Sequence, residues 1–119
     1  MNDLSVRADS LARGIAAANR MIDVSCPKRQ ARAQAVRVTA LVLTTDAVHA
    51  VVPSSDGSAH YRVRIVHTPN RAWKCSCPDA AQRGQSAGPC KHAIAVARAT
   101  LAAANAELAA LATVLTTAP

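Results

Sequence analysis

Apolar and small residues recur every three or four positions near the start of the chain, from Asp3 to about Asp23. This spacing predicts a helix with one apolar face. The residues of that face are Leu4, Ala8, Leu11, Ile15, Ala18 and Ile22. Ser25 and Pro27 then indicate a break and a restart, because serine caps helices and proline fits their first turn.

The next stretch, Pro27 to Leu43, carries two conflicting patterns. Strong helix formers fill its first half, from Lys28 to Ala35. Its second half has the alternation of a strand, with apolar positions at Val36, Val38, Ala40 and Val42. We favour a helix that runs to about Leu43.

Signals for a small antiparallel sheet of about three strands follow. We expect strands at Ala47 to Val52, His60 to His67 and Arg71 to Ser76. An Asp-Gly turn within 53–58 joins the first two as a hairpin, and Thr68-Pro69-Asn70 turns the chain again. In the second strand Tyr61, Val63 and Ile65 occupy one face, and Arg62 and Arg64 the other.

From Cys90 almost to its end the chain has the pattern of one long helix. Apolar positions alternate at three and four residues, which makes a narrow seam of the coiled-coil type. They are Ile94, Ala97, Leu101, Ala104, Leu108, Leu111 and Leu115. The seam could pack on the N-terminal helix of the same chain or on a second copy, and the pattern leaves both alternatives open.

Two pairs of residues with metal-ligand chemistry lie between the sheet and this helix. Cys75-Ser76-Cys77 and Cys90-Lys91-His92 are separated by the polar run Pro78 to Pro89. Three thiolates and one imidazole are the ligands of a closed, structural Zn²⁺ site. Residues two apart on a strand point to the same side, whereas Cys90 must lie just outside the helix if His92 lies in its first turn.

The alternatives to a zinc site are disulfides or four unrelated residues. We favour zinc, because the N-terminus lacks the pattern of a signal peptide and we expect an intracellular, reducing location. We also expect that no stretch is long and uncharged enough to span a membrane. His67 is a nearby competitor as ligand but is expected to be an exposed loop residue, as are His49 and His60. Cys26 is expected to be a free or half-buried thiol.

Composition supports a metal-stabilised core. Half of the 119 residues are apolar, but Phe is absent and the aromatic residues are Trp73 and Tyr61. A core of small side chains buries little area and needs further fixing, which a structural zinc supplies. The expected fold class is α+β, with a small zinc-stapled antiparallel sheet, a long C-terminal helix and an N-terminal helical flank. We divide the chain into a helical region (1–45), a zinc-binding core (46–99) and an extension of the last helix (100–119).

The two ligand pairs also resemble a known family. The strings Trp73-Lys74-Cys75-Ser76-Cys77-Pro78-Asp79 and Gly88-Pro89-Cys90-Lys91-His92-Ala93-Ile94-Ala95-Val96 are similar to the SWIM zinc finger, and the likeness covers about 47–99. The resemblance implies a zinc core with Cys75, Cys77, Cys90 and His92 as ligands. SWIM domains are thought to bind DNA or other proteins, and they occur in helicase-related ATPases, transposases and recombination-accessory proteins. One departure is Ala80, where such domains often carry a larger apolar residue.

Charge indicates the kind of partner. The chain has 14 Lys and Arg against 7 Asp and Glu, a formal net charge of +7, which favours an acidic partner such as nucleic acid. The basic residues expected to contact phosphates are Arg62, Arg64, Arg71, Lys74, Arg83 and Lys91. Because we expect Trp73 and Tyr61 to face inward, no platform for stacking single-stranded bases is evident.

We therefore expect a small zinc-finger protein that binds nucleic acid, DNA foremost, through phosphate contacts. The alternative is a protein-interaction adaptor or an accessory subunit of a larger DNA-processing assembly, with a homo-oligomer formed through the helical flanks. An enzyme is not expected, since no phosphate loop, paired carboxylates or catalytic triad has recognisable spacing.

Overall fold

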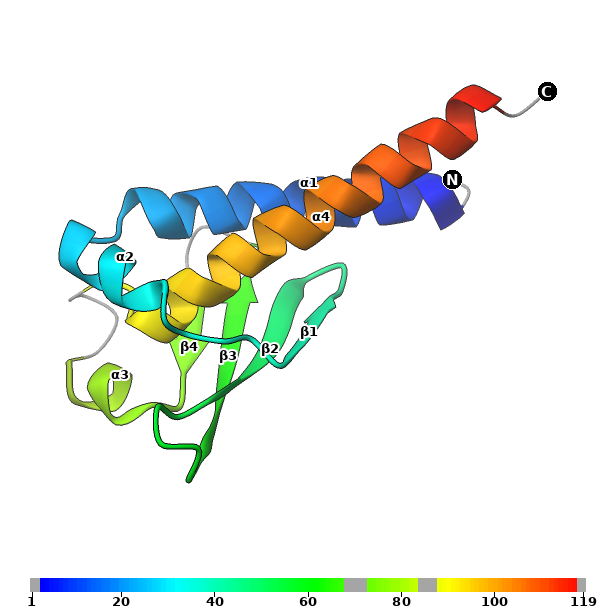
Figure 1. Ribbon diagram of the computed structural model, residues 1–119. Coiled ribbons are helices and arrows are strands. Elements are labelled where there is room, and N and C mark those ends of the chain that lie inside the picture. The colour runs from blue at the N-terminus through cyan, green and yellow to red at the C-terminus, as the bar shows by residue number, and fades with distance from the viewer. Residues whose placement is uncertain (1–2, 68–72, 84–87, 118–119) are drawn as a thin grey trace.

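The computed structural model describes residues 3–67, 73–83 and 88–117. The elements in chain order are α1 (Asp3–Asp23), α2 (Pro27–Ala33), β1 (Ala40–Leu43), β2 (Ala47–Pro53), β3 (His60–Val66), β4 (Trp73–Cys75), α3 (Pro78–Arg83) and α4 (Lys91–Thr117). Figure 1 shows α1 and α4 together on one side of the sheet, with α2 and α3 at the end of the molecule away from both termini. The expected α+β class is confirmed.

The strands form one antiparallel sheet in the order β1-β2-β3-β4. The predicted hairpin of β2 and β3 is confirmed, and its register pairs Ala50 with Val63. Along β3, Val63 and Ile65 are buried while Arg62 and Arg64 are exposed, as the alternation predicts. The sheet therefore has a covered face toward the helices and a second face that carries exposed side chains. The predicted turn Thr68-Pro69-Asn70 lies outside the described residues.

The prediction for Pro27 to Leu43 is wrong in its second half. The helix α2 ends at Ala33, and a fourth strand, β1, pairs with β2 from Ala40 opposite Val51 to Leu43 opposite Val48. Pairing with β2 satisfies the backbone groups on one side of this edge strand, and Leu43 is buried in the core. Valines also lose side-chain freedom in a helix, so the strand alternation was the stronger of the two local signals.

The bounds predicted for α1 are confirmed, but its buried face is turned slightly from the predicted one. Leu11 and Ala18 are buried as expected, whereas Leu4 is exposed. Gly14 is part of the buried face. A Cβ at this position would lie only 2.6 Å from Cδ1 of Leu43, so glycine is what lets α1 approach the end of β1 this closely.

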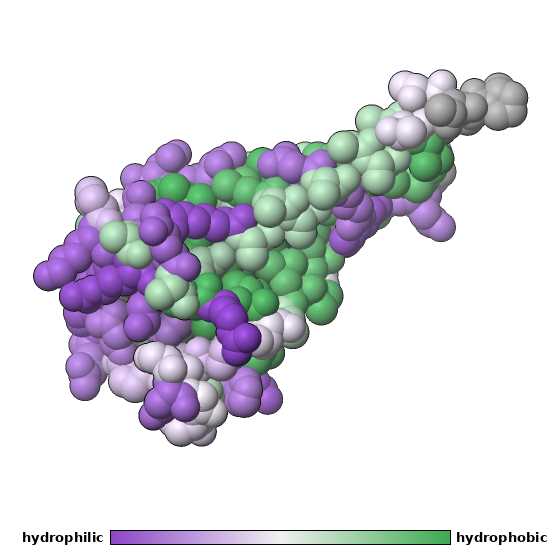
Figure 2. All heavy atoms as spheres, in the orientation of Figure 1, coloured by the Kyte–Doolittle hydropathy of each residue, from purple (hydrophilic) through white to green (hydrophobic). Residues whose placement is uncertain are grey.

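The long helix α4 packs along α1 and also contacts the sheet. Ala97 and Ala104 of the seam are buried, and Leu101, Leu108 and Leu111 pack against the same core half-buried. The intrachain alternative for the seam is therefore realised. Figure 2 shows hydrophilic residues gathered at the α2 end, while α4 is pale green along much of its length because it is rich in alanine.

One property of α4 differs from expectation. Its segment Lys91–Val114 is long and apolar enough, by length and composition, to cross a membrane. A third of that window is buried inside the fold, and core helices pass the same test, so this is weak evidence for a membrane span. The N-terminal part of α4 is a core element that packs on the sheet.

Candidate metal centre

The Cys-x-Cys pair lies where the sheet ends and the Cys-x-His pair where α4 begins. Cys75 is the last residue of β4, and Cys77 lies two residues further on, just before α3. Cys90 directly precedes α4, and its carbonyl accepts a hydrogen bond from the amide of Ile94 (3.1 Å). His92 is then the second residue of the helix. This is the arrangement that the spacing predicts.

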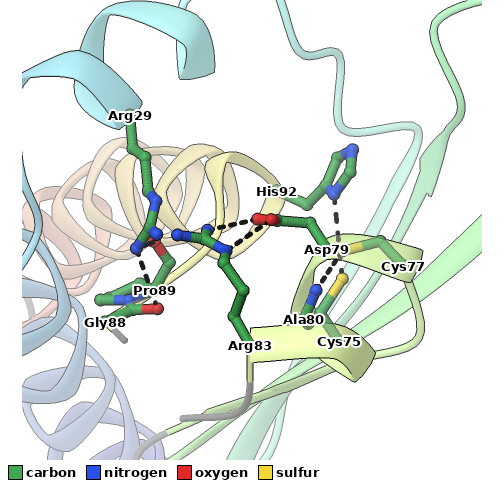
Figure 3. A network of polar contacts seen from close by, with 9 residues as sticks. All are labelled: Arg29, Cys75, Cys77, Asp79, Ala80, Arg83, Gly88, Pro89 and His92. Atoms are coloured by element: carbon green, nitrogen blue, oxygen red, sulfur yellow. Dashed lines mark hydrogen bonds and ion pairs between the residues drawn. The ribbon is translucent and has the colours of Figure 1, made fainter. Parts of the chain in front are cut away.

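The four ligand atoms lie within 4.8 Å of one another. The Sγ of Cys75 is 3.9 Å from Nδ1 of His92 (Figure 3). In a tetrahedral zinc site with Zn–S bonds of about 2.3 Å, neighbouring ligand atoms are about 3.8 Å apart. Cys77, Cys90 and His92 are nearly completely buried and Cys75 is half-buried. The donor set, its separation and its burial fit a structural Zn²⁺, which these four residues would hold.

The three clustered cysteines affect one another's pKa values, so that they do not all ionise equally easily. Burial raises the pKa of Cys77. The pKa of Cys75 is raised first by its hydrogen bond with Cys90 and then by burial, whereas the same hydrogen bond lowers the pKa of Cys90. One thiolate is thus favoured at the cost of its neighbours. A divalent cation removes this competition, because it stabilises all three thiolates together.

Backbone amides also face the sulfur atoms. The amide of Ala80 donates to Sγ of Cys77 at 3.4 Å, so the first turn of α3 points at this ligand. Hydrogen bonds of this kind partly offset the net negative charge of three thiolates around Zn²⁺. Asp79 and Arg83 form a bidentate ion pair along the exposed side of α3, in which Nε of Arg83 lies 2.6 Å from Oδ1 of Asp79.

The loop that leads into Cys90 is held from outside the ligand strings. Nη1 of Arg29, on α2, donates to the carbonyls of Gly88 (3.3 Å) and Pro89 (3.4 Å), as Figure 3 shows. Gly88 has φ +87°, a left-handed conformation that favours glycine. The role of Arg29 could not be predicted from the sequence, because it depends on how α2 packs on this loop.

A second contact that the sequence did not reveal is made by Tyr61. Its ring lies on the covered face of β3, with its centroid 5.0 Å from that of His92. Such a tilted ring contact restricts the rotation of the imidazole and so helps to present Nδ1 to the thiols. The expected inward orientation of Tyr61 and of Trp73, which is 5% exposed, is confirmed.

The remaining histidines and the isolated cysteine lie away from the cluster. Cys26 is exposed and free, as expected. His49 and His60 are exposed. His67 is not the exposed residue that we expected: it is half-buried, and its Nδ1 contacts the carbonyl oxygen of Thr45 at 2.9 Å.

The basic residues expected at a nucleic-acid interface are divided among different places. Arg62, Arg64 and Lys74 share the exposed face of the sheet, where Arg64 is the register partner of Lys74. Arg83 is paired with Asp79 on α3. Lys91 lies at the start of α4, beside a hollow of about 300 Å³ that Arg29, Arg32, Asp79 and His92 also line. Arg71 lies outside the described residues.

The fold and the site together define a zinc-binding domain in which two ligands come from the end of a sheet and two from the start of a helix. The family model for the SWIM zinc finger matches residues 66–101, which include all four ligand positions. The chain therefore carries a SWIM zinc finger over this segment, as the resemblance implied. The chain has no significant match among curated proteins or among solved structures.

Proposed function

We propose that this protein binds nucleic acid, DNA foremost, through contacts between phosphates and the open face of its sheet. The open face consists of the outward residues Ala40, Val42, His49, Val51, Arg62, Arg64 and Lys74. In this proposal the zinc is structural, because four protein donors complete a tetrahedron and leave no position for a substrate. The protein acts by binding and not by catalysis.

The observation that carries the proposal is the grouping of three cations on the open face. Arg62 and Arg64 stand two residues apart on β3, and Lys74 stands opposite Arg64 on β4. None of the seven acidic residues lies in a strand. Among the described residues, the ion pairs are Arg7 with Glu107, Arg13 with Asp9 and Arg83 with Asp79, so these three cations are not paired with a carboxylate. This favours a polyanion as their partner.

The test is a titration of the zinc-loaded protein with labelled DNA over a salt series. We expect affinity to fall steeply with salt, and Arg62→Ala with Arg64→Ala to weaken binding to all sequences alike. The double variant should lower the slope of log affinity against log salt by about two. The matched control is Arg13→Ala with Lys28→Ala, which removes the same charge from exposed positions of α1 and α2. Equal affinities of both double variants would contradict the proposal.

A protein-interaction adaptor is the second candidate. It is favoured by exposed apolar residues at the end of the α1–α4 pair, where Leu4, Val6 and Val114 are 37%, 40% and 54% exposed. Such a patch would join two copies or dock a larger enzyme. If the protein is a dimer and Val114→Glu dissociates it without changing DNA affinity, the dimer interface lies at this end of the α1–α4 pair. We also propose an intracellular location, because clustered thiol ligands and the free Cys26 are typical of a reducing compartment.

A further inference from the structure

The open face is divided into an apolar half and a cationic half. Two rows of paired residues cross the sheet from β1 toward β4. One row runs Val42, His49, Arg64, Lys74, and the other runs Ala40, Val51, Arg62. Both rows are therefore apolar on β1 and basic on β3. The change occurs at β2, where His49 and Val51 stand.

This divided surface is hollowed and accessible. Its residues line a concavity of about 540 Å³ that extends over all four strands. Val42 is 59% exposed although it lies in a strand. An apolar surface of this kind, next to unopposed cations, fits a ligand that is itself apolar on one side and anionic on the other.

Single-stranded and duplex DNA differ in this respect. A duplex encloses its bases and presents phosphates along both strands, so an apolar half beside the cations would face charged backbone or water. An extended single strand carries its phosphates along one side and its unpaired bases along the other. The second arrangement matches the division of the open face.

The spacing of the sheet fits the same ligand. Arg62 and Arg64 are about 7 Å apart along β3 at a rise of about 3.4 Å per residue. This is close to the separation of successive phosphates in an extended strand. β1 and β3 are two strand spacings apart, about 10 Å, which allows bases to reach Val42 while their phosphates lie over β3.

His49 lies at the boundary of the two halves and offers a planar ring to a base. It is exposed and has Val42 and Arg64 as its register partners. Imidazole rings and guanidinium planes both stack on unpaired bases. The inward position of Trp73 and Tyr61 therefore does not deprive the protein of a stacking surface.

We propose that the open face binds single-stranded DNA in preference to duplex, with phosphates on Arg62, Arg64 and Lys74 and with bases over His49, Val51 and Val42. This inference rests on the proposed function, since it names the form of nucleic acid that the same face binds. The DNA backbone runs along β3, and the bases project across β2 toward β1.

The experiment measures anisotropy of one labelled mixed-sequence oligonucleotide as single-stranded DNA, as duplex and as its RNA equivalent, with the full zinc-loaded chain. We expect single-stranded DNA to bind about tenfold tighter than duplex at moderate salt. His49→Ala and Val42→Ser should each weaken single-strand binding about fivefold, within the range of one lost stacking or apolar contact, and leave duplex binding unchanged. Val24→Ser, at another exposed valine that directly follows α1 and lies outside the strands, is the control.

Other outcomes separate the inference from the proposed function. Duplex binding as tight as single-strand binding, with Arg62 and Arg64 still required, would overturn the inference and leave the proposed function standing. Tighter binding of the RNA would overturn the assignment to DNA. No binding of any form at low salt would overturn both and favour the protein-interaction adaptor. Zinc content and circular dichroism of each variant show that a loss does not come from misfolding.

Discussion

His67 lies half-buried at the end of β3, with one ring nitrogen satisfied and the other not. Because a carbonyl only accepts, the contact with Thr45 means that Nδ1 carries the proton and donates it. Nε2 is buried and has no hydrogen-bond partner among the described residues. Protonating Nε2 would bury a charged N–H without an acceptor. Burial is accordingly the largest of the causes that lower the pKa of His67. The positive charges of Arg13 and Arg20 lower this pKa further, whereas the hydrogen bond to Thr45 and the charge of Asp46 raise it.

Stability should therefore depend on pH through His67. Its folded pKa lies below the unfolded value of about 6.5, so the unfolded chain binds more protons as pH falls below neutrality. The free energy of unfolding should fall from about pH 7 downward and level off below the folded pKa. His67→Asn keeps a donor for Thr45 but does not titrate, and it should lose this part of the dependence. Urea unfolding of both zinc-loaded proteins measures it, and parallel pH profiles would contradict the interpretation.

The short helix α2, which ends ten residues before the predicted helix would, braces the loop that leads to Cys90. Arg29 holds the carbonyls of Gly88 and Pro89. From the other side, Nη1 of Arg98 on α4 donates to the carbonyl of Gln30 at 3.0 Å. The helix α2 is thus fastened both to the loop before Cys90 and to the helix after it, although it lies outside the matched segment 66–101.

We expect Arg29→Ala to weaken zinc binding although Arg29 is not a ligand. Loss of its hydrogen bonds should cost about 1 kcal/mol, roughly fivefold in zinc affinity, because Cys90 is then held less firmly. Lys28→Ala removes the same charge from the adjacent exposed position and should leave the affinity unchanged. Competition with a chromophoric chelator measures both variants. Equal zinc affinities of the Arg29→Ala and Lys28→Ala variants would show that the hydrogen bonds of Arg29 do not affect metal binding.

At the scale of the whole molecule, zinc ligands and helix contacts belong to one core. The main buried cluster contains Leu11 and Met21 of α1, Ile65 of β3, the ligand Cys77 and Ala104 of α4. Loss of the zinc would remove the link between the end of β4 and the start of α4 within this cluster. Because the cluster is continuous, we expect the helices to unfold with it.

Purified protein should contain one equivalent of zinc, and a chelator should unfold sheet and helices together, since structural zinc contributes an apparent ~10–16 kcal/mol. Trp73 is the single tryptophan and is buried in the same cluster as Cys77, so its fluorescence reports the core while far-ultraviolet circular dichroism reports the helices. Cys77→Ser and His92→Ala should mimic chelation. A metal-free protein with both signals intact would refute the structural role of zinc. If the helical signal persists after the fluorescence has changed, this would support the division into separate regions 1–45 and 100–119, which remains a prediction.

Much of the fold follows from local patterns. The bounds of α1, the hairpin of β2 and β3, and the position of Cys90 just before α4 were all predictable, because each depends on periodicity or on turn chemistry within a few residues. The strand β1 was missed because the helix formers of α2 come shortly before it, and only its pairing with β2 shows that the alternating residues after Ala35 include a strand.

The sequence by itself determined the identity of the metal ligands, since a Cys-x-Cys and a Cys-x-His pair at a strand end and a helix start have few other uses. Only the tertiary structure decided what surrounds them. Gly14 faces Leu43, Arg29 reaches Gly88, and Tyr61 lies against His92 through contacts between residues far apart in the chain. The same holds in part for the basic residues: alternation along β3 already places Arg62 and Arg64 on one face, but only the strand register brings Lys74 beside them.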